Sequence, residues 1–187
     1  MLVAITGVGG SGKTALAEAL AKRMKWRLMS LNDLAARAKA YIGYDKKRQS
    51  KIVSVAKMKK ELRKLMKESP KKYENLIIEG LYAHEFPADI VVVLRCEPKV
   101  LEKRLRRKYT WPTKITENVE AEMIGLIADE AVEYHDKNVY EIDTTESTAA
   151  QTAAKIEKII SLAASGESNE LKKYRVGRID WLKAANF

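Results

Sequence analysis

Short apolar runs alternate with longer amphipathic segments along most of the chain. Two of the runs, residues 76–78 and 90–94, are continuously apolar, which is typical of strands buried on both faces of a parallel sheet. Together with three further runs they predict five strands, at Leu2–Thr6, Trp26–Ser30, Tyr73–Glu79, Asp89–Arg95 and Asn138–Ile142. The segments between these strands then decide the fold class.

Apolar residues three or four positions apart predict helices between the strands. Four such helices lie at about Leu16–Met24, Pro98–Leu105, Val119–Ala131 and Ala149–Ala163. The third continues through Gly125, which the pattern does not treat as a break. Strands that alternate with helices imply right-handed βαβ units. The predicted fold is therefore α/β: a doubly wound parallel sheet of about five strands with helices on both faces.

Two segments do not fit a simple crossover between strands. Residues 31–67 combine helical material with a polar run at residues 43–51, and residues 107–117 are basic and interrupt two helices at Trp111-Pro112. Both are expected to lie over the carboxyl edge of the sheet, where open α/β sheets bind ligands. The tail at residues 166–187 is basic, and either a short packed helix or an arm for a partner explains it. We expect a single domain over residues 1–187.

The composition, with 46% hydrophobic and 32% charged residues, is typical of soluble globular proteins. A length of 187 residues suits one domain with a sizeable core. No apolar run reaches the ~18 residues of a membrane span, and no secretory signal is recognisable. The single cysteine, Cys96, forms no internal disulfide. We expect a cytoplasmic monomer that does not bind membranes.

The net charge of +10 is unevenly distributed. Residues 46–72 hold twelve Lys or Arg but only two acidic residues, and a second basic cluster occupies residues 103–108. Such clusters attract nucleotide phosphates or an RNA backbone. For residues 57–67 a solvated helix face is an equally good explanation.

The residues between the first strand and the first helix match the phosphate-binding pattern GxxxxGK[ST]. Its glycines let backbone N–H groups approach phosphates, and the start of the following helix favours anions. Lys13 supplies a positive charge for the β- and γ-phosphates. The alternative, a Gly-rich turn without a ligand, does not explain the strand and helix that flank the motif. We expect ATP to contact Gly7, Gly9, Gly10, Ser11, Gly12, Lys13, Thr14 and Ala15.

A magnesium ion is expected beside this loop. The Thr14 hydroxyl is placed to bind Mg²⁺, and Glu79 ends a buried neighbouring strand. Because Mg²⁺ tends to keep its water molecules, Glu79 is expected to act directly or through water. An ordinary carboxylate at a strand end is the alternative for Glu79.

Several stretches, in order, match one known family along most of the chain. They are the phosphate loop, Asn32–Ala35, Gly43–Asp45, Ile78–Gly80, Val92–Pro98, Leu101 with Arg104-Leu105, Lys114-Ile115 with Asn118, Ala121-Glu122, Glu130-Ala131 and Glu141–Thr145. The tail residues Tyr174–Trp181 are similar to the end of archaeal members. In these residues the chain resembles the adenylate kinase 6 (Fap7) family of nucleotide kinases.

The resemblance implies a core with an insert for a nucleoside monophosphate (NMP) near residues 30–53 and a lid near residues 107–117. It implies Asp33, Asp45 and Arg48 as acceptor-binding residues, although Arg48 is equally explained as one more charge in a basic run. Arg107 and Lys108 would act with Lys13 in catalysis, and Lys108 would also bind ATP. The implied activity is phosphoryl transfer from ATP to an NMP, with AMP the expected acceptor, and an ATPase side activity. The implied partners are a small-subunit ribosomal protein and rRNA, in maturation of the small ribosomal subunit.

Four positions depart from the family pattern and bear on the acceptor and the lid. Ser54 and Ala56 stand where the family has two Asp, Leu81 where it has His, and Lys108 where it has Arg. His84 is near enough to Leu81 to replace the missing His, although a packing role is the more common one for a lone His. Arg107 is one position from the missing Arg. These changes leave ATP binding intact and alter the chemistry of NMP phosphorylation.

Two other functions fit the same loop. An ATP-switched ribosome assembly factor with little NMP kinase activity is favoured by the basic stretch at residues 46–72 and by the basic tail. A kinase for another small metabolite, of the dephospho-coenzyme A or shikimate type, uses the same core. The resemblances at Asn118 and residues 143–145 argue against the second.

Overall fold

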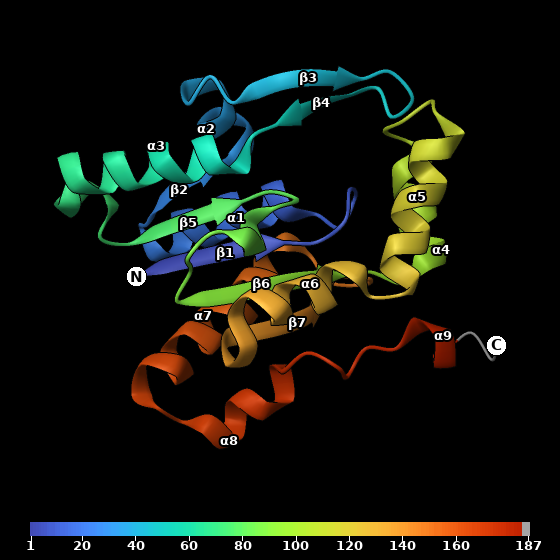
Figure 1. Ribbon diagram of the computed structural model, residues 1–187. Coiled ribbons are helices and arrows are strands. Elements are labelled where there is room, and N and C mark those ends of the chain that lie inside the picture. The colour runs from blue at the N-terminus through green and yellow to red at the C-terminus, as the bar shows by residue number, and fades with distance from the viewer. Residues whose placement is uncertain (185–187) are drawn as a thin grey trace.

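The structure is a computed structural model, which describes residues 1–184. Its centre is a five-stranded parallel sheet with the order β2-β5-β1-β6-β7 (Figure 1). The strands are β1 (Leu2–Thr6), β2 (Arg27–Ser30), β5 (Leu76–Glu79), β6 (Ile90–Arg95) and β7 (Val139–Asp143). This confirms the predicted fold class. Strand β5 begins later than the sequence predicts, because Pro70–Tyr73 form a 3₁₀ turn before it.

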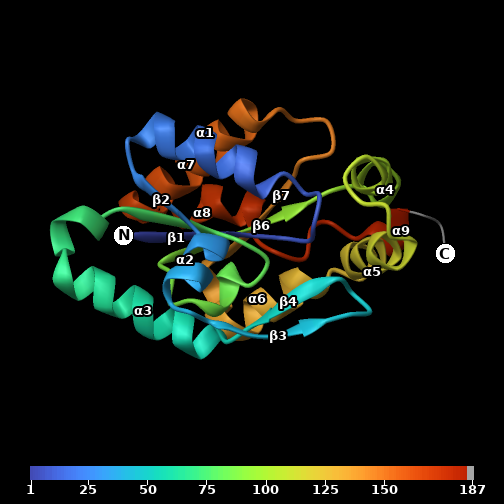
Figure 2. The same ribbon diagram turned by 90° about the horizontal axis from the view of Figure 1, so that it is seen from above.

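Helices cover both faces of the sheet and bury its apolar side chains in two clusters (Figure 2). On one face lie α1 (Lys13–Met24) and α7 (Ala149–Ser165), which pack against each other. On the other lie α2 (Leu31–Arg37), α3 (Val55–Glu68) and α6 (Leu126–His135). The strands β1, β5 and β6 are buried along their whole length, as the continuous apolar runs at residues 76–78 and 90–94 predict for β5 and β6.

The insert between β2 and β5 contains a hairpin that the sequence pattern does not predict. Its strands are β3 (Tyr41–Asp45) and β4 (Ser50–Val53), paired antiparallel. Most of the hairpin's side chains are exposed, so its residues lack the alternation of buried and exposed positions that identifies a strand. Ser54, one of the departures from the family pattern, caps α3: its hydroxyl accepts a hydrogen bond from the Lys57 N–H.

Two helices stand beyond the carboxyl edge of the sheet, to the right in Figure 1. They are α4 (Pro98–Arg106) and α5 (Pro112–Met123), joined by the basic residues that the sequence sets apart. The predicted continuous helix Val119–Ala131 is wrong, because Gly125 adopts φ 71° and separates α5 from α6. A left-handed glycine ends a helix readily since it lacks a Cβ atom.

The tail packs on the domain as far as it is described. It contains α8 (Ser168–Leu171), a 3₁₀ turn at Lys172–Tyr174 and α9 (Trp181–Ala184). Two further 3₁₀ turns lie earlier in the chain, at Ala83–Glu85 and Asp136–Asn138. Leu171 is buried, and Arg175 forms an antiparallel bridge with Tyr140 of β7. The segment then runs to the side of α5 (Figures 1 and 2). Within residues 1–184, no helix combines the length and the apolar character needed to span a bilayer.

Candidate active site

The glycine-rich loop lies between β1 and α1, in the context that the sequence predicts. The residue before α1 is Gly12, which has φ 94° and offers no side-chain cap, and the first turn of the helix has no acidic residue. The first N–H groups of a helix have no partner within the helix, and they carry the positive end of its dipole. The loop therefore presents N–H donors to an anion, and no acidic side chain in the first turn of α1 competes with that anion for them.

Lys13 is folded back onto this loop. Its ammonium group donates to the carbonyl oxygens of Gly7 at 2.8 Å and Val8 at 2.9 Å. Burial lowers the pKa of Lys13 from 10.5 to about 8; Glu79 and Glu122 raise it, and Lys108 lowers it further. A phosphate near this ammonium would favour its charged form, so the group is suited to a polyanionic ligand.

Thr14 and Glu79 lie together, as predicted for a magnesium site. The Thr14 hydroxyl is 3.5 Å from the Glu79 carboxylate, which ends β5 and is 6% exposed. Within residues 1–184, no three His, Cys, Asp or Glu side chains are grouped so as to hold a metal ion. One hydroxyl and one carboxylate fit Mg²⁺ carried by the nucleotide, because this ion is usually bound by few protein ligands together with phosphates and water.

Asn118, on α5, contacts the loop directly. Its side-chain oxygen accepts a hydrogen bond from the Gly9 N–H at 2.8 Å, and its amide nitrogen donates to the Lys114 carbonyl at 2.7 Å. A Cβ atom at Gly9 would come within 2.7 Å of the same oxygen, so only glycine allows this approach. The sequence identifies Asn118 as part of a family resemblance but does not assign it to the site.

Arg104 was also not predicted as a site residue. From α4 its guanidinium donates to the carbonyl oxygens of Thr144 and Thr145, at 2.9 and 2.8 Å. The Thr144 hydroxyl lies 3.2 Å from the Ser11 carbonyl, so the end of β7 is tied to the phosphate loop. The matched stretch Glu141–Thr145 was the available signal, but the contacts join segments far apart in the sequence.

The predicted lid residues follow the end of α4. Arg107 and Lys108 are exposed, and Lys108 is close enough to Lys13 to lower its pKa. Arg106 forms an ion pair with Glu102 in the preceding turn of the helix, at 2.6 Å. Of the three neighbouring basic residues, Lys108 is therefore the one with an electrostatic effect on the loop in this structure.

The predicted acceptor residues lie on the insert. Arg48 follows β3, where its guanidinium contacts Asp45 at 3.3 Å and Glu117 of α5 at 3.1 Å. The hairpin therefore reaches α5 at a residue within the predicted lid segment, residues 107–117. These contacts lower the pKa of Asp45, chiefly through the Arg48 backbone N–H, and raise the pKa of Arg48, chiefly through Glu117. Asp33 is exposed on α2, apart from this group of contacts.

His84 does not take an open position beside Leu81. Its ring is 1% exposed, its Nδ1 lies 3.0 Å from the Thr6 hydroxyl, and its Nε2 lies 3.3 Å from Glu130. Burial, with smaller effects of His135 and Lys59, lowers the pKa of His84 to about 4. The ring is therefore neutral and packed under β1, and Leu81 remains exposed in its own position.

Comparison with protein families matches residues 3–125 of this chain to the AAA domain family. A protein of Methanosarcina acetivorans named "Putative adenylate kinase" is 40% identical over 184 residues, which span 97% of this chain and 98% of that protein. A protein of the same name from Pyrococcus abyssi is 37% identical, over 97% of this chain and 91% of that protein.

Solved structures of two kinases share the fold. Shikimate kinase from Acinetobacter baumannii has a TM-score of 0.57 at 17% identity, with 86% of this chain and 92% of that chain covered. Thymidylate kinase from Candida albicans has a TM-score of 0.58 at 13% identity, with 87% and 92% covered. At these identities the likeness concerns the fold. The family match and the archaeal relatives show that this chain belongs to the AAA domain family, as a kinase-type P-loop protein related to the archaeal proteins that bear the adenylate kinase name.

Proposed function

We propose that the protein transfers the γ-phosphoryl group of ATP to a nucleoside monophosphate, with AMP as the preferred acceptor. The observation that carries the proposal is the partly buried ammonium of Lys13 inside a glycine-rich loop at the start of α1, with Thr14 and Glu79 beside it. The names of the archaeal relatives support AMP as the acceptor. The finer assignment is to the adenylate kinase 6 (Fap7) type of nucleotide kinase.

The proposed chemistry is positioning and neutralisation of charge, without a covalent intermediate. ATP would lie with its phosphates on Gly7, Gly9, Gly10, Ser11, Gly12, Lys13, Thr14 and Ala15. Mg²⁺, held by Thr14 and by Glu79 directly or through water, would supply positive charge at the phosphates. The acceptor oxygen attacks the γ-phosphorus as the bond to the β,γ-bridging oxygen breaks, so ADP leaves and the acceptor gains the phosphoryl group.

The lid and the insert would complete the site. We assign residues 107–117 as a lid that brings Arg107 and Lys108 to the transferring group and excludes water. We assign residues 30–53 as the acceptor-binding insert, with Asp33, Asp45 and Arg48 facing the monophosphate. The contact between Arg48 and Glu117 supports this assignment, because it joins the insert to the last residue of the lid segment.

The proposal is tested by product analysis. Purified protein is incubated with ATP, Mg²⁺ and each NMP in turn, and all nucleotides are separated and quantified. We expect AMP to be converted to ADP and Lys13→Ala to abolish the conversion. Hydrolysis of ATP with no NMP phosphorylated would overturn the proposal.

Arg48 provides a test of the acceptor site. Arg48→Ala should raise the KM for AMP about tenfold, because a bound monophosphate loses a charged hydrogen bond, and should leave the KM for ATP nearly unchanged. Lys47→Ala, which removes a neighbouring exposed charge, is the matched control and should change neither constant. Equal changes in both KM values would show that Arg48 does not act on the acceptor.

A second function is favoured by the surface of α3. Lys57, Lys60, Arg63 and Lys67 are exposed on this helix, and within residues 1–184 none of the four forms an ion pair with an acidic side chain. Such a surface suits an ATP-switched assembly factor that binds rRNA or a ribosomal protein of the small subunit.

The second function predicts salt-sensitive binding of RNA. Binding of small-subunit rRNA fragments should weaken steeply between 50 and 200 mM salt, on the order of tenfold or more. Neutralising Lys57, Lys60 and Lys67 together should weaken it at low salt. Absence of binding at low salt would exclude RNA as the partner.

A further inference from the structure

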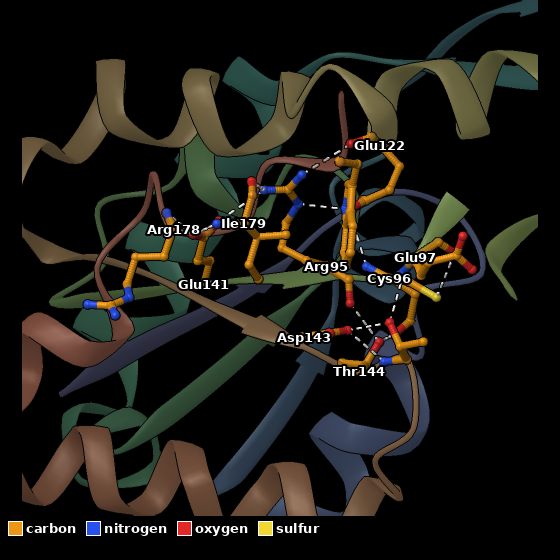
Figure 3. Close-up of polar contacts among 12 residues, drawn as sticks. Arg95, Cys96, Glu97, Glu122, Glu141, Asp143, Thr144, Arg178 and Ile179 are labelled. Carbon is orange, nitrogen blue, oxygen red and sulfur yellow. Dashed lines mark hydrogen bonds and ion pairs between the residues drawn. The ribbon is translucent and has the colours of Figure 1, made fainter. Parts of the chain in front are cut away.

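A buried charged network lies under the carboxyl end of β6. Figure 3 shows the Arg95 guanidinium between two carboxylates, with Glu122 of α5 at 2.7 Å and Glu141 of β7 at 2.9 Å. All three side chains are at most 4% exposed. One cation thus faces two carboxylates, and further hydrogen-bond donors are needed to satisfy them.

The C-terminal segment supplies those donors. The backbone N–H groups of Arg178 and Ile179 donate to Glu141 Oε1 at 2.7 and 2.8 Å (Figure 3). The Trp181 indole N–H donates to Glu122 Oε1 at 2.8 Å, the same oxygen that Arg95 contacts. The tail therefore completes a network that joins β6, β7 and α5.

The network reaches the phosphate loop through α5. Glu122 and Asn118 are four residues apart on α5 and so lie on one side of that helix. Asn118 accepts the hydrogen bond of the Gly9 N–H. A shift of Glu122 would thus move the side chain that holds Gly9.

We propose that residues 178–181 of the tail are a positioning element of the phosphate loop, in which Trp181 acts through Glu122 on the placement of Asn118 against Gly9. Within residues 1–184, the Trp181 side chain forms its hydrogen bond with Glu122 and none with the loop or Asn118, so it is a positioning residue. The proposal rests on the phosphate-binding part of the proposed function. It does not depend on which acceptor is used.

The test measures binding of pyrophosphate and of ADP, each with Mg²⁺, by calorimetry. Pyrophosphate is included because Trp181 also lines a hollow with Glu97, Asp143, Thr145, Glu146, Ser147 and Lys155, where a base could lie against it. Trp181→Phe keeps an aromatic ring and removes the indole donor. Arg178→Ala is the matched control, since Arg178 contributes through its backbone N–H, which the variant retains.

We expect Trp181→Phe to weaken both ligands by about tenfold, the order of effect of one lost hydrogen bond to a charged group. Arg178→Ala should bind both as the unmodified protein does. The double variant Trp181→Phe/Asn118→Ala should bind no more weakly than Asn118→Ala alone, because the two residues act in series.

Three results would overturn the proposal: unchanged binding in Trp181→Phe, loss of affinity for ADP but not for pyrophosphate, or independent effects in the double variant. Loss of ADP affinity alone would show that Trp181 contacts the base. A protein that bound pyrophosphate as expected but phosphorylated no NMP would overturn the proposed function and leave this inference standing.

A second measurement needs no variant and holds even if Trp181→Phe does not fold. Linkage is reciprocal, so a tail that positions the loop must respond when the loop is filled. In the unmodified protein, pyrophosphate should slow amide hydrogen exchange at Arg178 and Ile179 as well as in residues 7–14. Slower exchange in the loop with unchanged exchange in the tail would contradict the coupling.

Discussion

Lys13 shows how burial determines the chemistry of a single side chain. The motif predicts its position, but its chemical state depends on neighbours that come from β5, α5 and the turn after α4. The sequence correctly places Thr14 beside Glu79, since the carboxyl ends of parallel strands meet at one edge. It does not reveal Arg104 or Asn118, whose partners are 40 and 109 residues away.

Phosphate binding should become weaker as the pH rises above about 8. Burial lowers the pKa of Lys13 to about 8, and bound phosphates would raise it, so binding at pH 8–9 should take up a proton. Calorimetry of ADP binding in buffers of different ionisation enthalpy measures this uptake. Lys108→Ala should raise the pH at which phosphate binding weakens, because the Lys108 charge is one of the causes that lower the pKa of Lys13.

Lys13 also makes the stability of the unliganded protein depend on pH, and this stability rises with pH where phosphate binding weakens. The pKa of about 8 in the folded protein lies below the ordinary lysine value of 10.5, so between these pH values the unfolded chain holds more protons. The contribution of Lys13 to the free energy of unfolding of the unliganded protein therefore rises across that window.

An affinity for ADP that stayed constant from pH 7 to 10, with no proton uptake, would contradict the assignment of Lys13 as a phosphate-binding residue.

Removing the Arg95 guanidinium, the buried cation between Glu122 and Glu141, should destabilise the fold. Arg95→Met leaves Glu122 and Glu141 buried together without their counter-charge, and should lower the free energy of unfolding by about 3–5 kcal/mol. Urea denaturation measures the loss. Arg23→Met, which breaks the exposed ion pair with Glu157, is the control and should cost at most about 1 kcal/mol. Similar losses in both variants would mean that the network does not stabilise the fold.

At the scale of elements, the predictions succeeded where burial gives a regular pattern. The continuous apolar runs of β5 and β6 identified strands buried on both faces. The hairpin β3–β4 was not predicted because its side chains are largely exposed, so its sequence lacks the alternation of apolar and polar residues that identifies a strand. The tail could not be placed either, because its contacts with Glu122 and Glu141 are tertiary.

Gly125 tests the break between α5 and α6. The sequence pattern runs through it as one helix, but its φ of 71° is a conformation that costs other residues about 1–2 kcal/mol. Gly125→Ala should therefore lower the free energy of unfolding by about 1 kcal/mol in urea denaturation. Gly125→Asn should cost less, because Asn tolerates this conformation better. A stabilising alanine would mean that α5 and α6 form one helix in solution.

At the scale of the whole molecule, the site is assembled from segments that only the fold brings together. The phosphate loop follows β1, Glu79 ends β5, Thr144 follows β7, and Asn118 comes from α5. All lie at the carboxyl edge of the sheet, beside the hairpin and the two helices that stand over it (Figure 1). The motif alone identifies a loop for phosphates; this assembly adds Glu79, Thr144 and Asn118 around that loop.

The most direct test of the central claim follows the γ-phosphoryl group itself. ATP labelled at the γ-phosphorus is incubated with the protein, Mg²⁺ and AMP, and the labelled products are separated before the reaction reaches equilibrium. The account predicts that the label appears in the β-phosphate of newly formed ADP, and that Lys13→Ala forms none. Label found only as inorganic phosphate, with AMP unconsumed, would contradict it.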